Sequence, residues 1–143
     1  MKLKLPEFEY RVKKSEGQNM IFDIIRKKYI VLTPEEWVRQ HLIHFFINQC
    51  NYPPTLISVE REININGLRR RFDLVIYKDS QPWIIVECKA PSVTLTQAVF
   101  DQVFCYNTSL QAPYIAISNG IDNICVALKK DGTYSIIPYF PAW

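Results

Sequence analysis

The sequence has no long apolar run and no secretion signal at its start. Its longest uninterrupted apolar stretches, such as Ile84-Ile85-Val86, are a few residues long, far short of the roughly 20 that cross a bilayer. The basic first residues are followed by Glu7 and Glu9 rather than by an apolar stretch with a small-residue cleavage site. We therefore expect a cytoplasmic protein with no membrane helix.

Paired metal-binding cysteines are also lacking. The four cysteines are widely spread and form no C-x-x-C pair: Cys50, Cys88, Cys105 and Cys125. Each has apolar neighbours, which is typical of free thiols in a protein core and fits a reducing cytoplasm. His41 and His44 have no Cys or carboxylate cluster near them at zinc-ligand spacing. We expect no zinc site.

The chain contains no internal repeat, no low-complexity segment and no G-x-x-x-x-G-K-[ST] phosphate loop. Translocation of DNA by this chain alone is therefore excluded. Its 143 residues, 48% of them hydrophobic, suit one domain over 1–143 with one substantial core. Within it, we expect 1–32 to be a β-rich extension that packs on the core.

Positive charge is modest in total and uneven along the chain. The net charge of +3 weakly favours a polyanionic partner. The clusters Arg26-Lys27-Lys28 and Arg69-Arg70-Arg71 could each meet a phosphate backbone. Solvated turns and strand ends explain each cluster equally well.

Periodicity predicts two helices and a mixed sheet. Thr33-Pro34-Glu35-Glu36 supplies an N-cap hydroxyl, a proline at the first helical position and a glutamate three residues after the cap. An apolar stripe at three- and four-residue spacing then predicts a helix over 34–50. A second helix is expected over 94–110, crossing the sheet.

The predicted strands surround these helices. Asn66-Gly67 has the residue types of a tight type I′ hairpin, with arms near 56–65 and 68–77. Further strands are expected over 83–89, 114–118, 124–128 and 134–137, and the apolar run of the first of these indicates a central position. The fold class is α/β (α+β), a mixed central sheet flanked by helices.

Two carboxylates and an ammonium are predicted to converge on this sheet. Glu87 and Lys89 lie on one face of a strand, roughly 6.6 Å apart along it, and Asp73 on the neighbouring strand can approach Glu87 at about 4.8 Å. Hard oxygen ligands suit Mg²⁺, with Mn²⁺ as a substitute, and the backbone carbonyl of Cys88 could complete the coordination. Lys89 could then orient or deprotonate a water, or neutralise charge on the phosphate.

Ordinary ion pairs are the competing explanation, since Glu-x-Lys is a weak motif alone. Charges after four apolar residues on a central strand, however, seldom lack a partner or a metal.

With these residues the chain resembles the PD-(D/E)XK nucleases, and more closely the N-terminal nuclease domain of type I restriction enzyme R subunits. The resemblance runs from about residue 20 to 130 and is carried by the following segments: Thr33 to Gln40, Glu60, Arg70 to Val75, Val86 to Pro91, Gln102 with Tyr106-Asn107, and Ser118-Asn119-Gly120. It implies an αβββαβ core, the order that periodicity also predicts. Type I R subunits continue into motor domains, whereas we expect no motor within these 143 residues because they contain no phosphate loop.

The resemblance also implies roles for further residues. Glu36 on the first helix would reach the metal, and Gln102 and Tyr106 would line the site from the second helix. A capping box explains Glu36 equally well, and a surface contact explains the pair on the second helix. Glu60 or Glu62 is a further candidate ligand, although solvated strand charges are more common.

The function expected from this reasoning is metal-dependent hydrolysis of DNA by an endonuclease. Asp73, Glu87 and Lys89, with Gln102, are the expected catalytic residues. Asp73, Glu87, Cys88 and Glu36 are the expected metal ligands, and Arg69, Arg70, Arg71 and Tyr106 the expected substrate-binding residues. Expected partners are DNA, other restriction-system subunits and a second copy of the chain. The alternatives are a non-catalytic nucleic-acid-binding or subunit-docking module, and an unrelated protein in which the acidic cluster is structural.

Overall fold

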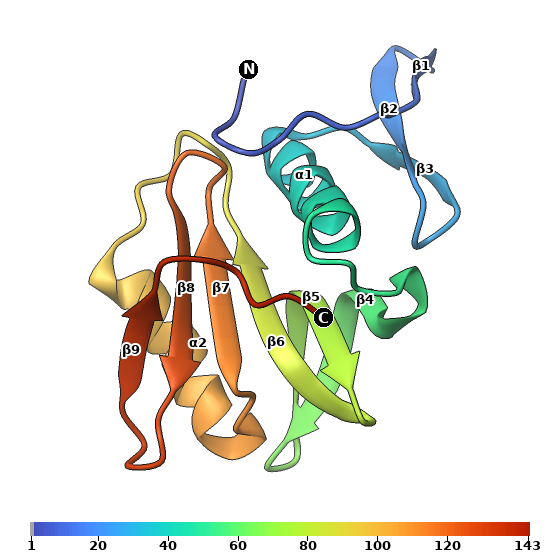
Figure 1. Ribbon diagram of the computed structural model, residues 1–143. Coiled ribbons are helices and arrows are strands. Elements are labelled where there is room, and N and C mark those ends of the chain that lie inside the picture. The colour runs from blue at the N-terminus through green and yellow to red at the C-terminus, as the bar shows by residue number, and fades with distance from the viewer. Residues whose placement is uncertain (1) are drawn as a thin grey trace.

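The computed structural model describes residues 2–143, which form two sheets and two α-helices (Figure 1). In chain order the elements are β1 Val12–Ser15, β2 Gln18–Asp23, β3 Lys28–Val31, α1 Pro34–Asn48, a 3-10 turn η1 Pro54–Leu56, β4 Ile57–Ile65, β5 Leu68–Lys78, β6 Gln81–Cys88, α2 Gln97–Leu110, β7 Tyr114–Ser118, β8 Asn123–Leu128 and β9 Tyr134–Ile137. Each predicted helix and strand is present, with ends shifted by at most three residues.

The larger sheet has six strands in the order β4-β5-β6-β7-β8-β9. Strands β6 and β7 are parallel and are joined by α2, whereas the other neighbours are antiparallel. The sheet is therefore mixed, and the predicted αβββαβ order is confirmed. Strands β1, β2 and β3 form a separate three-stranded sheet.

Tight turns fix the register of β4, β5 and β6. Asn66 and Gly67 both have positive φ, 51° and 82°, as a type I′ turn requires. Asp79 and Ser80, between β5 and β6, also have positive φ. These short turns allow few alternative registers among β4, β5 and β6, so the turns themselves set the pairing of β5 with β6.

The two helices cover opposite faces of the large sheet. Val38, Leu42, Ile43 and Phe46 of α1 pack with Leu74, Ile76, Ile84 and Val86 in one buried cluster. Val103 of α2 packs with the alternate residues Val75, Ile85, Ile115 and Ile117 in another. The alternation along β6 shows that both of its faces are covered, which confirms the predicted central position.

Helix α1 begins as predicted, because the Thr33 hydroxyl accepts the Glu36 N–H at 3.0 Å. The return bond of a capping box is replaced by contacts of the Glu36 carboxylate with Arg26, Arg39 and Gln40. The capping-box interpretation of Glu36 is therefore correct only for its backbone.

The N-terminal extension contacts the core at several points. The Lys4 N–H donates to the Gly120 carbonyl at 2.7 Å, and the Phe8 ring stacks on His44 at 4.2 Å between centroids. Gly120 has φ +85°, and a Cβ there would lie 2.8 Å from Leu3 Cδ2. This position requires glycine both for its backbone and for the close approach of Leu3.

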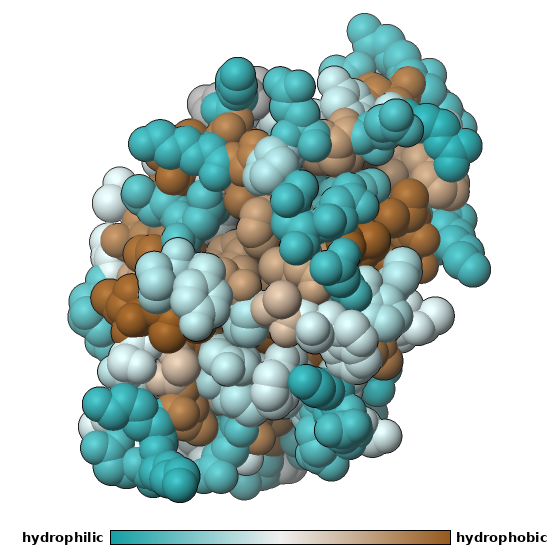
Figure 2. All heavy atoms as spheres, viewed as in Figure 1, coloured by the Kyte–Doolittle hydropathy of each residue, from teal (hydrophilic) through white to brown (hydrophobic). Residues whose placement is uncertain are grey.

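Surface features complete the description. Hydrophilic residues gather over the β1–β2 hairpin and over the lower tips of the strands (Figure 2). Cys50, Cys88 and Cys125 are buried as predicted, but Cys105 is exposed because it lies on the outer side of α2. Within residues 2–143, no helix has the length and apolarity to cross a membrane.

Candidate functional site

Asp73 and Glu87 meet at the end of the β5–β6 pair. The register Leu74↔Val86 places position 73 beside position 87, and the Cys88 N–H donates to Asp73 Oδ2 at 2.7 Å. Burial first, and then the charge of the neighbouring Asp73 carboxylate and a hydrogen bond with it, raise the pKa of Glu87 to about 8. Near neutral pH the two carboxyl groups, here called the carboxylate pair, therefore retain a proton on Glu87.

A third carboxyl group and an ammonium group lie close enough to the carboxylate pair for their charges to act on it. Burial raises the pKa of Glu35, in the first turn of α1, and the charge of Asp73 raises it further. Lys89 opposes the rise of the pKa at both Glu35 and Glu87. The structure thus brings together Asp73, Glu87 and Lys89, as predicted, and adds Glu35.

Lys89 is held by the Ser118-Asn119-Gly120 segment. The Lys89 N–H donates to the Ser118 carbonyl at 2.8 Å. The Asn119 side-chain amide donates to the Val93 carbonyl at 2.8 Å, and its Oδ1 accepts the N–H groups of Ile121 and Asp122. This segment therefore fixes the position of the backbone at Lys89, directly after the end of β6.

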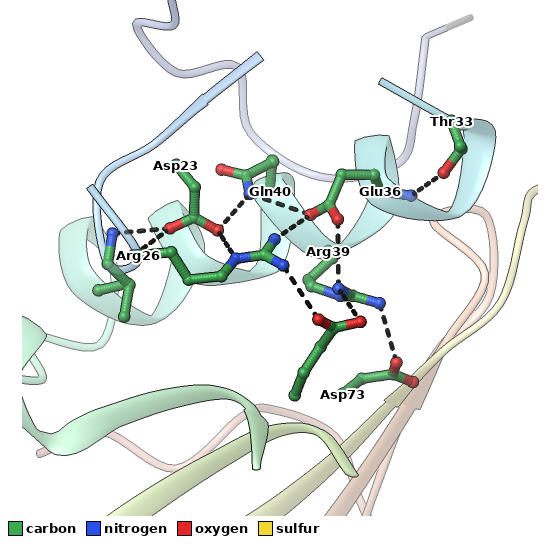
Figure 3. A network of polar contacts seen from close by, with 9 residues as sticks. Asp23, Arg26, Thr33, Glu36, Arg39, Gln40 and Asp73 are labelled. Atoms are coloured by element: carbon green, nitrogen blue, oxygen red, sulfur yellow. Dashed lines mark hydrogen bonds and ion pairs between the residues drawn. The ribbon is translucent and has the colours of Figure 1, made fainter. Parts of the chain in front are cut away.

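Beside the carboxylate pair lies an arginine cluster. It is formed by Asp23, Arg26, Glu36, Arg39 and Gln40 (Figure 3), together with Glu60, which contacts both arginines. Arg26 contacts Asp23 at 2.8 Å and Glu36 at 3.0 Å. Arg39 contacts Glu36 at 3.2 Å and Asp73 Oδ1 at 3.1 Å. The arginine cluster therefore links the N-terminal extension, α1 and the carboxylate pair.

A kink in β4 brings Glu60 into the arginine cluster. Glu60 lies between the pairs Val59↔Leu74 and Arg61↔Phe72 and has a φ of 52°. A non-glycine residue in this region costs on the order of 1 kcal/mol. Its carboxylate contacts Arg26 at 3.3 Å and Arg39 at 3.4 Å, which offsets the cost.

Three acidic candidates from the sequence have arginine partners instead of facing the carboxylate pair. Both oxygens of Glu36 are bound by Arg26, Arg39 and Gln40, so Glu35 is the acidic residue of α1 at the pair. Glu60 contacts both arginines of the cluster. Glu62 is exposed and lies 3.8 Å from Arg69.

The predicted substrate-binding residues lie along β5 and α2. Tyr106 packs edge-on against the Phe72 ring at 6.1 Å, and the Arg70 guanidinium lies 5.1 Å from the centre of the Tyr106 ring. Tyr106 and Arg70 thus lie together near Phe72, the residue before Asp73 in β5. Arg69 and Arg71 are exposed on the same strand, and Gln102 is exposed one turn before Tyr106.

Arg26, from the first basic cluster, is not available to a phosphate backbone in this arrangement. Its guanidinium is bound by Asp23, Glu36 and Glu60. The interpretation of Arg26 as a solvated turn residue is also wrong, since 85% of its side chain is covered (15% exposed).

The oxygen donors present fit a divalent cation bound through two carboxylates. Within residues 2–143 there is no group of three His, Cys, Asp or Glu side chains arranged to hold a metal ion. Mg²⁺, however, takes only one or two carboxylates from a protein and keeps several waters. A cation at the carboxylate pair would replace the proton that Glu87 otherwise retains. The Cys88 thiol is excluded as a donor, because it is fully buried in the core beneath α1.

Comparison with known proteins assigns the family. Residues 34–141 match the family model of the type I restriction enzyme R protein N terminus. The chain belongs to this family. No curated protein matches the sequence.

One solved structure shares the fold. It is a fragment of a protein described as an HsdR subunit of a type I restriction enzyme from Vibrio vulnificus YJ016. The match covers 73% of this chain and 23% of that one, with a TM-score of 0.51 and 16% identity. At this identity the match shows the fold, which agrees with the family assignment. The chain therefore matches about a quarter of the length of that fragment.

Proposed function

We propose that this member of the type I R-protein N-terminal family is a metal-dependent endonuclease that hydrolyses phosphodiester bonds in DNA. The observation that supports the proposal most is the carboxylate pair, where burial and a neighbouring carboxylate raise the pKa of Glu87 to about 8. Perturbed carboxyl groups of this kind gather at functional sites. DNA and other restriction-system subunits are the proposed partners, and the cytoplasm is the proposed location.

In this proposal Asp73 and Glu87 hold Mg²⁺, or Mn²⁺ in its place, and the Cys88 carbonyl is the third protein oxygen. Glu35 takes the role that the family resemblance implied for Glu36, through its charge near the pair. When bound, the metal ion would neutralise negative charge on the scissile phosphate. Arg39 holds Asp73 Oδ1 at 3.1 Å and so fixes the direction of one carboxylate.

The remaining residues act on water and substrate. Lys89 orients or deprotonates the attacking water and balances charge on the phosphate. Gln102 and Tyr106 line the substrate side from α2, and Arg70 with Arg71 and Arg69 contacts the DNA backbone along β5. Arg70 is the best placed of the three, because the Tyr106 ring supports its guanidinium.

A second candidate is a non-catalytic module that binds DNA or a partner subunit. It is favoured by one observation: both oxygens of Asp73 have protein partners, Arg39 Nη2 at 3.1 Å and the Cys88 N–H at 2.7 Å. In that case Asp73 would serve to join α1 to the sheet. Replacing it would then reduce the free energy of unfolding, since a buried arginine would lose its partner.

Cleavage of supercoiled plasmid separates the two candidates. Wild-type protein is incubated with Mg²⁺, Mn²⁺ or chelator, beside Glu87→Gln, Lys89→Ala and the matched control Glu62→Gln on exposed β4. The nuclease proposal predicts metal-dependent nicking that both site variants lose and the control keeps. Absence of nicking by folded wild-type protein with either metal would leave only the binding module.

A further inference from the structure

An apolar cavity of about 610 Å³ lies beside the proposed active site. Its lining residues that matter here are Tyr10, Val12, Leu32, Pro34, Trp37 and Pro91, and we call this cavity the base pocket. Two of its walls adjoin the site directly: Pro34 precedes Glu35, and Pro91 follows Lys89 by two residues. The cavity lining is therefore close along the chain to Glu35 and Lys89, the two groups whose charges act on Glu87 of the carboxylate pair.

The shape and chemistry of the base pocket suit a flat aromatic ligand with polar edges. The Tyr10 ring meets the Trp37 ring edge-on at 5.2 Å between centroids, and proline rings contribute to the other walls. Thr33 and Ser92 also line the cavity. The Thr33 oxygen accepts the Glu36 N–H, which leaves its hydroxyl proton free to donate to a ligand.

Positive charge lies on the same side of the cavity. Lys14 follows Val12 by two residues in β1, so these two side chains share a face of the strand, and Val12 lines the cavity. Lys89 lies two residues before Pro91, another residue of the cavity lining. A ligand that fits between two cations, with an aromatic ring and a neighbouring phosphate, has the chemistry of a nucleotide within a DNA strand.

We propose that the base pocket binds one unpaired nucleobase of the substrate strand, next to the phosphate that is cut. The inference rests on the proposed nuclease function and specifies its substrate class: DNA with an exposed base, either single-stranded or locally opened duplex. A base inside an intact duplex is stacked on both faces and cannot enter. Base–aromatic stacking tolerates any sequence, so the base pocket adds affinity without base specificity.

The test asks whether the protein binds DNA with bases more tightly than abasic DNA, and whether this preference depends on Tyr10. Binding of a fluorescent oligothymidylate and of its abasic counterpart is measured by anisotropy, with chelator present so that no cleavage occurs. The proteins are wild type, Tyr10→Ala, the conservative Tyr10→Phe, and the control Tyr139→Ala, which removes an exposed tyrosine that does not line the base pocket.

Wild-type protein is expected to bind the oligothymidylate about 5- to 20-fold more tightly than the abasic strand, the range of one base–aromatic stack at a half-exposed ring. Tyr10→Ala should abolish most of that difference, whereas Tyr10→Phe and Tyr139→Ala should keep it. Equal discrimination in Tyr10→Ala and wild type would overturn the base pocket and leave the nuclease proposal standing. Failure of wild-type protein to bind either strand would also overturn the base pocket, whereas the nuclease proposal is decided separately by the nicking of supercoiled plasmid.

Wild-type protein supplies a second readout that needs no variant. Trp37 lines the base pocket, whereas Trp83 and Trp143 do not, so a stacked base should quench part of the tryptophan emission. Oligothymidylate should quench it and the abasic strand should not. Equal quenching by the two strands would overturn the proposal.

Discussion

Two adjoining charge clusters in this protein are balanced in opposite ways. In the arginine cluster, each of Asp23, Glu36 and Glu60 lies within 3.4 Å of an arginine nitrogen. In the carboxylate pair, Asp73 shares Arg39, and Glu87 has no ion pair within 4.0 Å to any residue from 2 to 143. The charges of the first cluster are paired without a ligand, although the buried Arg39 Nε and Gln40 Oε1 have no hydrogen-bond partner among residues 2–143. The second cluster has room for one more positive charge.

This difference separates a structural cluster from a functional one. A buried charge with a partner stabilises the fold only while the partner is present. A buried carboxyl group without a cation keeps a proton and lowers stability when it ionises. The arginine cluster joins the extension to α1, and the carboxylate pair is the part that the protein maintains at a cost in stability.

The largest expected effect comes from breaking the arginine cluster. Arg26→Met removes the guanidinium that pairs with Asp23, whose side chain is 0% exposed, and should lower the free energy of unfolding by about 3–5 kcal/mol. Denaturant unfolding measures it. The control Arg69→Met removes an exposed pair and should cost less than about 0.5 kcal/mol. Equal losses in the two variants would show that the arginine cluster is no more than a surface feature.

At the carboxylate pair, substitution is expected to raise the free energy of unfolding rather than to lower it. The folded protein holds a proton on Glu87 up to about pH 8, whereas the unfolded chain releases it near the ordinary value of 4.5. Glu87 therefore lowers the free energy of unfolding progressively as pH rises from about 4.5 to about 8. Glu87→Gln should remove that dependence and gain roughly 2–4 kcal/mol at about pH 8.

Urea unfolding of Glu87→Gln and wild type near pH 5 and near pH 8 measures this difference. The free energy of unfolding of the variant should exceed that of wild type only slightly near pH 5, and by the full expected amount near pH 8. A variant that is less stable than wild type near pH 8 would mean that ionised Glu87 has a stabilising partner.

A smaller effect is expected from loosening the chain that carries Lys89. Asn119→Ala removes the bond to Val93 and two bonds within the turn, which should lower the free energy of unfolding by about 1–2 kcal/mol. Cleavage should fall about tenfold because Lys89 is less well placed. Gln97→Ala, which removes one exposed bond to Asp101, is the control for both measurements. Normal cleavage by Asn119→Ala would show that the position of Lys89 does not depend on these hydrogen bonds of Asn119.

Most of the fold was predictable because local patterns decide it. Asn66-Gly67 fixed one hairpin through backbone conformation, and the apolar run from Trp83 to Val86 indicated the central strand. The meeting of Asp73 with Glu87 followed from the register that such short turns allow.

The choice between Glu35 and Glu36 was not predictable in the same way. Adjacent helical residues point about 100° apart, so the helix alone cannot say which one faces the sheet. That choice depends on Arg26, which binds Glu36 from a segment ten residues earlier. Arg39 and Gln40 were missed as buried residues for the same reason, since their partners come from the extension and from β4 and β5.

The most direct test of the central claim, that the carboxylate pair is a cation site, is the pH dependence of Mn²⁺ affinity by calorimetry. Binding to wild-type protein must displace the proton on Glu87, so affinity should rise about tenfold per pH unit below pH 8, level off above it, and release close to one proton. Glu87→Gln should bind weakly at every pH, and Glu62→Gln should match wild type. Affinity that is independent of pH, or unchanged in Glu87→Gln, would contradict the account.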